Sequence, residues 1–187
     1  MQKSNIFIIS GPSGAGEDSI ITELEKQLPI ERIITTTTRD KRPSENEGVD
    51  YYFTSKEDFE RRLTSEEFAE HAKQYNGNLY GVTKEELRRV QESGKIGVWK
   101  IEYKGVITVK KLHPEIVAIL INTMTLKVLE DRIRHRDNVS EEYIKERMEY
   151  TKKWLSHKAI YDYAVVNENG KLSQAVKEVV DIIKLNS

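Results

Sequence analysis

The chain has 187 residues, about the length of one globular domain and long enough to bury a sizeable core. Its 30 Lys and Arg residues are balanced by 31 Asp and Glu residues, which argues against a basic body that neutralises nucleic-acid phosphates. The absence of cysteine excludes disulfides, thiolate metal sites and a cysteine nucleophile. The apolar run 6–9 is too short for a signal peptide, and no segment approaches the about 18 apolar residues of a membrane span. We expect a soluble, cytoplasmic protein that binds neither nucleic acid nor membrane.

Short apolar runs alternate with longer amphipathic runs along the chain. Residues 5–10 contain four consecutive apolar side chains, at 6–9, and are followed by Gly11-Pro12, which predicts a buried strand over 5–10. Residues 19–28 carry apolar side chains at helical spacing, which predicts a helix that ends before Pro29. This alternation of strand and helix predicts an α/β fold with a parallel sheet covered on both faces. Further strands are predicted at 31–35, 96–101, 116–121 and 163–166, and further helices at 84–93, 143–155 and 172–183.

Two polar segments interrupt this alternation. Residues 35–81 are too many for a connecting loop in a compact domain, so we expect an inserted subdomain with short β-strands and a helix near 56–63. The second segment, at about 125–138, carries several arginines and precedes a charged helix. A core with two polar insertions suits an enzyme that closes over its substrates.

A glycine-rich segment at 11–16, Gly-Pro-Ser-Gly-Ala-Gly, lies between the first predicted strand and the first predicted helix. Glycines let the backbone curl so that successive N–H groups converge on an anion, and the helix N-terminus adds the positive end of its dipole. A glycine-rich turn can also be purely structural, but the strand before it and the helix after it favour phosphate binding. We therefore predict a phosphate site that includes Ser13, Gly14, Ala15 and Gly16.

The residues that follow depart from the usual phosphate loop. Such loops continue Gly-Lys-[Ser/Thr], whereas Gly16 is followed here by Glu17, Asp18 and Ser19. An acid stands in place of the phosphate-neutralising lysine, and Asp18 stands in place of the magnesium-binding hydroxyl. Two carboxylates should repel a nucleotide's phosphates unless a metal ion or another cation intervenes. Both acids also suit the first turn of a helix, so loss of ATP use is an open alternative.

Several ordered blocks of the sequence resemble the guanylate kinase family. Residues 37–43 (Thr-Thr-Arg-Asp-Lys-Arg-Pro) are similar to the family's Thr-Thr-Arg-x-x-Arg-Pro run, and residues 48–53 (Gly-Val-Asp-Tyr-Tyr-Phe) to its Gly-x-Asp-Tyr-x-Phe run. Residues 67–70 and 77–81 continue the match, which extends to 161–167. The resemblance implies phosphoryl transfer from Mg-ATP to GMP, and also to dGMP.

The resemblance also implies how the single domain is divided. It places a P-loop core at 1–34 and 84–187, a GMP-binding insertion at about 35–83 and a mobile lid at about 125–150.

The implied GMP site lies in and around the insertion. Arginine forks and hydroxyl groups bind a phosphate dianion, and carboxylates accept hydrogen bonds from N1–H and N2–H of guanine, which selects guanine over adenine. Val82 stands where relatives usually carry a hydroxyl residue, which makes the adjacent Thr83 a candidate substitute. The implied residues are Thr35, Arg39, Arg42, Tyr51 and Tyr80 for the phosphate, and Glu70 and Glu102 for the base, with Thr83 beside them.

The resemblance further implies that Arg132, Arg136 and Arg147 meet ATP and the transferring phosphoryl group. Charge neutralisation and positioning provide most of the catalysis in such a transfer. On spacing alone, arginines on polar helices are more often solvated or paired with neighbouring glutamates. Arg134 has no counterpart in the family and is expected at the surface, whereas Asn167 matches a position near the adenine.

A second departure mirrors the one in the loop. Residues 99–105 (Trp-Lys-Ile-Glu-Tyr-Lys-Gly) align with the family's Leu-Asp-Ile-Asp-x-Gln-Gly, so Lys100 replaces an aspartate at the carboxyl end of a core strand. The loop position changes from Lys to Glu and the strand position from Asp to Lys, so the two changes in charge cancel. We hypothesise that Lys100 supplies the catalytic cation, and that Glu17 pairs with it or, with Asp18, helps to hold Mg²⁺. Independent decay of the ATP site would leave the same residues.

The leading interpretation is a guanylate kinase that acts on ATP and GMP, with Mg²⁺ as cofactor and no protein nucleophile, as a monomer or homodimer. A catalytically impaired module of the same family, which binds nucleotide or a protein partner, is the first alternative. A kinase of the same fold with another phosphorylated acceptor is the second.

Overall fold

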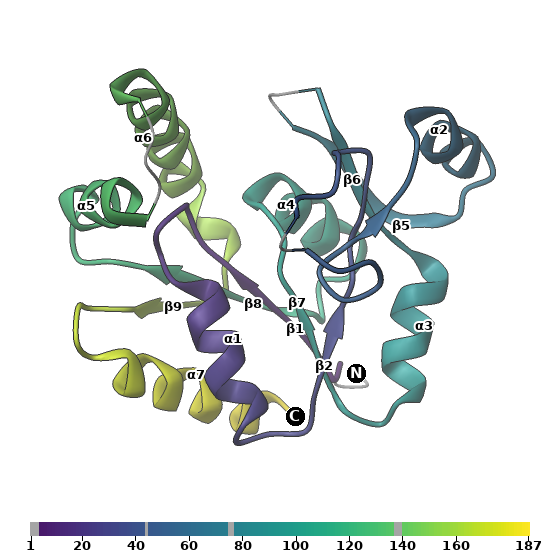
Figure 1. Cartoon of the computed structure of the whole chain (residues 1–187). Helices are drawn as coiled ribbons and strands as arrows, with labels where there is room; N and C mark the ends of the chain where they lie inside the picture. The colour runs from purple at the N-terminus through teal and green to yellow at the C-terminus, as the bar shows by residue number, and fades with distance from the viewer. Residues whose placement is uncertain (1–3, 44, 75–76, 137–139) are drawn as a thin grey trace.

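The computed structural model describes residues 4–43, 45–74, 77–136 and 140–187, without the side chain of Arg136. Its centre is a five-stranded parallel sheet with helices on both faces (Figure 1). The strand order is β2-β7-β1-β8-β9, so β1 lies in the middle. This arrangement confirms the predicted α/β fold. The strands are β1 (Ile6–Ser10), β2 (Ile30–Ile33), β7 (Ile96–Trp99), β8 (Val117–Asn122) and β9 (Tyr163–Val166).

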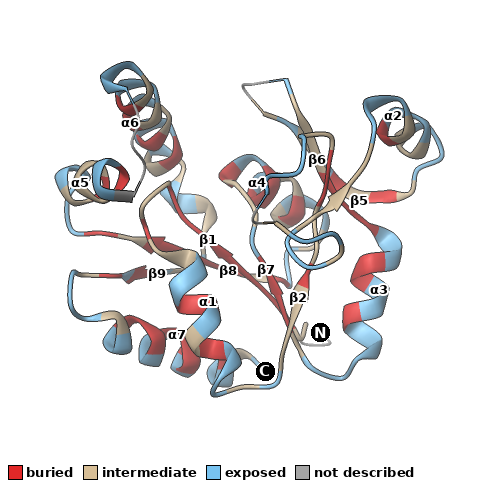
Figure 2. Ribbon diagram, in the orientation of Figure 1, coloured by how far each residue is buried: buried red, intermediate tan, exposed pale blue. Residues whose placement is uncertain are grey.

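The middle strand explains why its sequence is apolar at consecutive positions. All five residues of β1 are buried, because helices cover both faces of the sheet (Figure 2). Phe7 and Ile9 pack in one core cluster with residues of α1 (Glu17–Glu25) and α7 (Leu172–Asn186). Ile6 and Ile8 pack in a second cluster on the other face, with residues of α3 (Lys84–Glu92) and α4 (Tyr103–Leu112).

A second, four-stranded sheet of order β4-β3-β6-β5 forms within the predicted insertion. It is covered by α2 (Lys56–Thr64), whose Phe59 ring stacks on Phe68 of the sheet with centroids 4.2 Å apart. The short strands and the helix near 56–63 that the sequence predicts are therefore confirmed. The strands are β3 (Thr36–Thr37), β4 (Tyr52–Phe53), β5 (Phe68–Lys73) and β6 (Leu79–Thr83).

The remaining helices differ from the sequence predictions in two places. The polar segment expected at about 125–138 is helical over α5 (Leu126–Arg136), and α6 (Glu141–Ser156) and the short η1 (Lys158–Ile160) follow it. The sequence analysis missed α4 altogether. This helix contains Gly105 and the β-branched run 106–109, and the low helix propensity of these residues gives no helix signal in the sequence. The segment is helical because it packs against β1 and β5. None of the described helices is long and apolar enough to cross a membrane.

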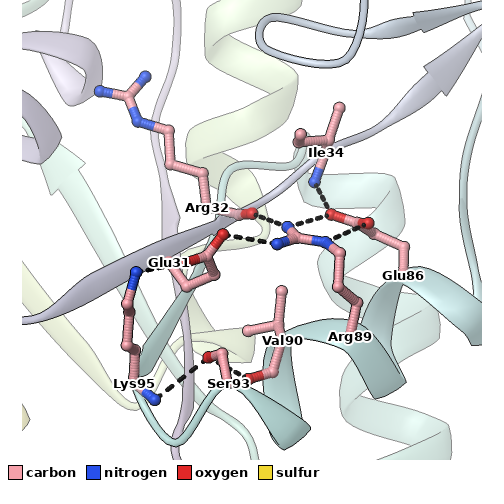
Figure 3. Close-up of polar contacts among 8 residues, drawn as sticks. All are labelled: Glu31, Arg32, Ile34, Glu86, Arg89, Val90, Ser93 and Lys95. Carbon is pink, nitrogen blue, oxygen red and sulfur yellow. Dashed lines mark hydrogen bonds and ion pairs between the residues drawn. The ribbon is translucent and has the colours of Figure 1, made fainter.

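A polar network joins the core to both ends of the chain segment that forms the second sheet (Figure 3). Glu86 in α3 is only 4% exposed, and its carboxylate accepts from the backbone N–H of Ile34 at 2.7 Å. Arg89 makes two hydrogen bonds to Glu86, each of 2.9 Å, and also contacts Glu31 and the carbonyl of Arg32 on β2. Ile34 precedes the second sheet and α3 follows it. The network therefore fixes both places where the chain passes between the core and the second sheet to β2.

Candidate active site

A cavity of about 240 Å³ opens between the carboxyl ends of β1 and β7, the second sheet and α6. Open parallel sheets bind their ligands at this edge. The loop after β1 forms one wall, residues of the second sheet form another, and the segment after β7 lies between them. Its lining includes the side chains of Ser13, Glu17, Asp18, Thr35, Tyr51, Glu70, Tyr80, Lys100, Glu102, Arg147, Tyr150 and Trp154.

The glycine-rich loop is curled as a phosphate loop requires. Gly14 and Gly16 have φ of 87° and 94°, the left-handed region that favours glycine, and Gly16 is the N-cap of α1. The N–H of Ala15 donates to the carbonyl of Pro12 at 2.9 Å, which closes the turn. Asn167, at the end of β9, donates from Nδ2 to the carbonyl of Ala15 at 2.8 Å. The structure therefore places Asn167 on the carbonyl side of the loop.

Arg132 lies on the same outer side of the loop. Its Nη1 donates to the carbonyl of Gly14 at 3.0 Å, and its Nη2 donates to the carbonyl of Asn167 at 2.7 Å. The guanidinium is thus occupied by loop and β9 carbonyls and is not among the groups that line the cavity. In this conformation Arg132 lies at the back of the loop, so its expected contact with ATP and the transferring phosphoryl group stays a prediction.

The other arginines considered in the sequence have different surroundings. Arg147 on α6 lines the cavity, and its Nε donates to the hydroxyl of Tyr143 at 3.0 Å. Arg134 pairs with Glu130 and Glu141 at the surface, as expected. The side chain of Arg136 lies outside the described part of the chain.

Lys100 and the loop acids meet across the floor of the cavity. The Nζ of Lys100 lies 2.6 Å from Oδ1 of Asp18. The ion pair therefore joins Lys100 to Asp18, whereas Glu17, the partner named first by the sequence hypothesis, acts on Lys100 only as a nearby charge. The side chains of Lys100 and Asp18 are 43% and 72% exposed, so the pair adds little stability. An anionic ligand can therefore replace Asp18 beside Lys100 at low cost.

Glu17 has a different environment from its neighbour. Burial raises the pKa of its carboxyl to about 7, and the nearby charge of Lys100 only partly opposes this effect. Near neutral pH the loop therefore carries a carboxyl group that is partly protonated, which reduces the repulsion of phosphates that the sequence alone suggests. Ser19, in the same first turn, is exposed.

Two carboxyl groups lie at the other end of the cavity. Glu70 on β5 is 6% exposed, and burial raises its pKa to about 7. Its Oε1 lies so close to Gly105 that a Cβ at that position would be 2.9 Å away. Glu102, directly after β7, accepts a hydrogen bond from the Tyr150 hydroxyl at 2.6 Å. The cavity thus presents acceptors suited to a ligand edge that carries N–H donors.

Thr83 has another task. Its Oγ1 accepts from the backbone N–H of Glu86 at 3.1 Å and caps the N-terminus of α3. It is buried and is absent from the cavity lining, and its substitution for the hydroxyl missing at Val82 stays a prediction.

The predicted phosphate site of the second sheet is held together by a carboxylate. Arg39 pairs with Glu45 at 2.7 Å, and its guanidinium lies over the Tyr51 ring, 5.3 Å from the centroid. Glu45 also accepts from the backbone N–H of Arg42 at 2.9 Å. Thr35, Tyr51 and Tyr80 line the cavity, whereas Arg39 and Arg42 are not among its lining residues. A carboxylate of this chain therefore occupies an anion site beside Arg39.

Three residues near the site were missed by the sequence reasoning. Glu45 follows Arg42 by three residues and binds the Arg39 side chain and the Arg42 backbone, and Tyr150 and Trp154 follow Arg147 on α6 at offsets of three and seven residues. Those offsets put all three α6 residues on one helix face, which is the signal that could have found them.

The carboxyl groups beside the loop are possible ligands for a divalent cation. The described residues contain no group of three or more His, Cys, Asp or Glu side chains that could hold a metal ion alone. Asp18 and Glu17 both line the cavity, and Mg²⁺ commonly takes one or two carboxylates with phosphate oxygens. The residues present therefore fit an ion that arrives with a phosphorylated ligand.

The parallel sheet, the curled glycine loop at its carboxyl edge and the facing second sheet define a phosphate-loop nucleotide-binding fold. The family model described as guanylate kinase matches residues 3–186, and the chain belongs to the guanylate kinase family.

Individual relatives agree with this assignment. The guanylate kinase of Fusobacterium nucleatum is 34% identical over 184 residues, which cover 98% of each chain. That of Idiomarina loihiensis is 37% identical over 177 residues, covering 93% of this chain and 84% of the relative. The crystal structure of guanylate kinase from Anaplasma phagocytophilum superposes with a TM-score of 0.74 at 25% identity, covering 96% of this chain and 84% of that one.

Proposed function

We propose that the protein is a guanylate kinase, which transfers the γ-phosphoryl group of ATP to GMP, and also to dGMP, to give GDP and ADP. The observation that carries the proposal is one cavity that combines a phosphate loop, the carboxyl groups of buried Glu70 and half-buried Glu102, which suit a guanine edge, and the cations Lys100 and Arg147. Membership of the family supports the same reaction.

The proposed division of the chain follows from this cavity. The core at 1–34 and 84–187 holds the loop for ATP, and the insertion at about 35–83 holds GMP. The segment at about 125–150, which bears the arginines, acts as the lid.

Each substrate has its own end of the cavity. The loop residues Ser13 to Ser19 receive the triphosphate, and Asn167 lies behind them near the adenine. Glu70 and Glu102 accept from N1–H and N2–H of guanine, while Thr35, Tyr51 and Tyr80 meet its phosphate. Arg39 becomes a phosphate ligand when the phosphate takes the place of Glu45, which holds it now at 2.7 Å.

Transfer itself needs little covalent chemistry from the protein. The acceptor oxygen of GMP is already anionic, so neither a nucleophile nor a general base is required. Lys100 leaves Asp18 for the transferring phosphoryl group, and Arg147 approaches it from α6, so both neutralise the negative charge of the equatorial oxygens. Mg²⁺, when bound, would neutralise and orient the triphosphate, and Asp18, with Glu17 beside it, would hold the ion.

The experiment is ADP release from Mg-ATP by purified protein, measured with GMP, dGMP, AMP and phosphorylated sugars as acceptors. We expect turnover with GMP and dGMP and background rates with AMP and sugars. Arg147→Ala should lose about 100-fold in kcat. Arg134→Ala is the matched control, because Arg134 pairs with surface glutamates on α5 and α6.

No ADP release with GMP, together with no heat from ATP in calorimetry, would contradict the proposal. A cytoplasmic location and a monomeric or homodimeric state are further predictions, which cell fractionation and sedimentation measure.

A further inference from the structure

Two hydrogen-bonded connections run from α6 to the two residues that follow Lys100. In the first, the Tyr150 hydroxyl donates to Oε2 of Glu102 at 2.6 Å. In the second, Nε1 of Trp154 donates to the Tyr161 hydroxyl at 2.9 Å, which lies 3.0 Å from Oγ of Ser10. Ser10 in turn donates to the carbonyl of Ile101 at 2.6 Å. The backbone of Ile101 and the carboxylate of Glu102 are therefore both tied to one helix.

Aromatic packing fixes the helix face that makes these connections. Tyr103, the first residue of α4, is buried, and its ring lies 5.7 Å from Tyr150 and 5.5 Å from Trp154. The Tyr150 and Trp154 rings meet edge to face with centroids 6.1 Å apart. These contacts fix the Tyr150 ring, so its hydroxyl lies at a defined place beside Glu102.

Glu102 is placed so that its side chain is not used by its own helix. It is the N-cap residue of α4, yet its side chain makes no capping hydrogen bond. Shorter acids cap helices well because they reach the backbone N–H groups of the first turn. Glu102 instead extends into the cavity, with Tyr150 as the donor to Oε2.

We propose that Tyr150 is a positioning residue that determines base specificity: it holds Glu102 by Oε2 and thereby directs Oε1 to the N–H edge of guanine. The inference rests on the proposed function and adds to it a residue outside the blocks that resemble the family. Arg147 lies three residues earlier on α6, so the same helix holds the base-binding carboxylate and an arginine proposed for the phosphoryl group.

The hydroxyl of Tyr150 also controls the charge of Glu102. Burial raises the pKa of the Glu102 carboxyl, whereas the Tyr150 hydrogen bond and the charges of Arg147 and Lys104 oppose that rise. Glu70 from β5, Tyr161 before β9 and Tyr103 on α4 are the other titratable groups nearby. Only an ionised carboxylate accepts hydrogen bonds with both oxygens. Loss of the hydroxyl therefore moves the pKa of Glu102 upward and weakens guanine binding first at low pH.

The test is Tyr150→Phe, which keeps the ring and removes only the hydroxyl. We expect the KM for GMP to rise about tenfold, with kcat within about twofold of wild type, because hydrogen bonds to charged groups are among the strong ones. The acid limb of the pH profile of kcat/KM for GMP should move to higher pH. The preference for GMP over IMP, which lacks the 2-amino donors, should fall.

Two comparisons separate positioning from general structure. Tyr163→Phe is the matched control, because the Tyr163 hydroxyl accepts from Asn186 at 3.2 Å, and Tyr163 does not line the cavity. In a double-mutant cycle, Tyr150→Phe should add nothing once Glu102→Gln is present, since its effect passes through that carboxylate.

The outcomes are distinct. An active wild type with an unchanged KM and GMP/IMP ratio in Tyr150→Phe, or full additivity in the cycle, overturns the inference alone. A wild type without GMP turnover overturns the proposed function and this inference with it.

Discussion

The two ends of the cavity each contain a carboxyl group whose pKa is raised by its surroundings, and the two groups serve opposite needs. Glu17, in the loop, and Glu70, on β5, both have a pKa of about 7, and burial is the main cause in each case. Glu17 faces the site proposed for phosphates, where the neutral form is favourable. Glu70 faces the site proposed for guanine, where the ionised form is needed to accept from N–H groups. The same physical shift therefore favours one ligand below neutral pH and the other above it.

The surroundings of the two carboxyl groups differ as well. Glu70 stands among residues that resemble the family blocks. Glu17 is followed by Asp18, which lies 2.6 Å from Lys100, the cation proposed to replace the lysine of the loop. The proposed exchange changes the charge pattern at one end of the cavity and leaves the other end as it is.

The largest expected effect comes from removing the relocated cation. Lys100→Ala should lower kcat/KM for ATP by about 100-fold or more, because Lys100 neutralises charge that grows in the transition state. Glu17→Lys in the Lys100→Ala background should recover at least about tenfold, because it returns the cation to the loop. Lys177→Ala, on the exposed face of α7, is the control for loss of a lysine. Equal activity of Lys100→Ala and wild type in the ADP-release assay would refute the exchange.

The next largest effect comes from Glu70, at the end of the cavity proposed for guanine. Glu70→Gln should lower kcat/KM for GMP by about 30-fold, since the amide presents N–H donors to the N–H edge of guanine. ATP affinity, measured by calorimetry, should not change. Glu67→Gln on the same segment is the control, because Glu67 pairs with Arg62 instead. A parallel loss of ATP affinity would mean that the two ends are not independent.

The pH dependence compares both ends directly. Because the folded pKa of Glu17 is about 7, ATP affinity measured without Mg²⁺ should fall by about fivefold as pH rises from 6 to 8, when the loop gains a full negative charge that no metal ion neutralises. GMP affinity should change in the opposite direction, because Glu70 ionises over the same range. Calorimetry with each ligand at pH 6, 7 and 8 measures both slopes.

Glu17→Gln is the control for titration of the nucleotide itself. It should flatten the ATP slope and leave the GMP slope unchanged. The stability of the fold should also fall as pH rises. The folded protein holds the Glu17 proton more tightly than the unfolded chain does, so the free energy of unfolding decreases as pH rises from 4.5 through about 7. Glu17→Gln should therefore raise Tm at pH 8 and leave it unchanged near pH 4. An ATP slope that survives this substitution would assign the titration to another group.

The smallest effect tests the position of Glu70. In Gly105→Ala the new Cβ would stand 2.9 Å from Oε1 of Glu70, so the flexible carboxylate has to shift. We expect the KM for GMP to rise about threefold with ATP affinity unchanged, an effect of less than about 1 kcal/mol. Ile107→Ala, at an exposed position of α4, is the control for the helix. A tenfold change in ATP affinity would contradict this assignment.

The sequence was sufficient for the sheet but not for the orientation of side chains. Fully buried strands such as β1 can be recognised in the sequence as apolar runs, and their alternation with helices along the chain predicts the parallel sheet. Adjacent residues on a helix point about 100° apart, so the pairing of Lys100 with Asp18 in preference to Glu17 needed the position of α1. The orientation of Arg132 depended in the same way on how α5 packs, which no local pattern contains.

The bonds of Arg89 and Glu86 in Figure 3 have a mechanical consequence. They fasten the backbone at Ile34 and the first turns of α3 to the same strand of the core, and Glu86 is almost completely buried there. A movement of the second sheet relative to the core would therefore have to begin beyond these bonds, at Thr35 on one side and Thr83 on the other. Thr35 lines the cavity and would stay nearly in place, whereas parts of the second sheet farther from these two positions would be displaced more.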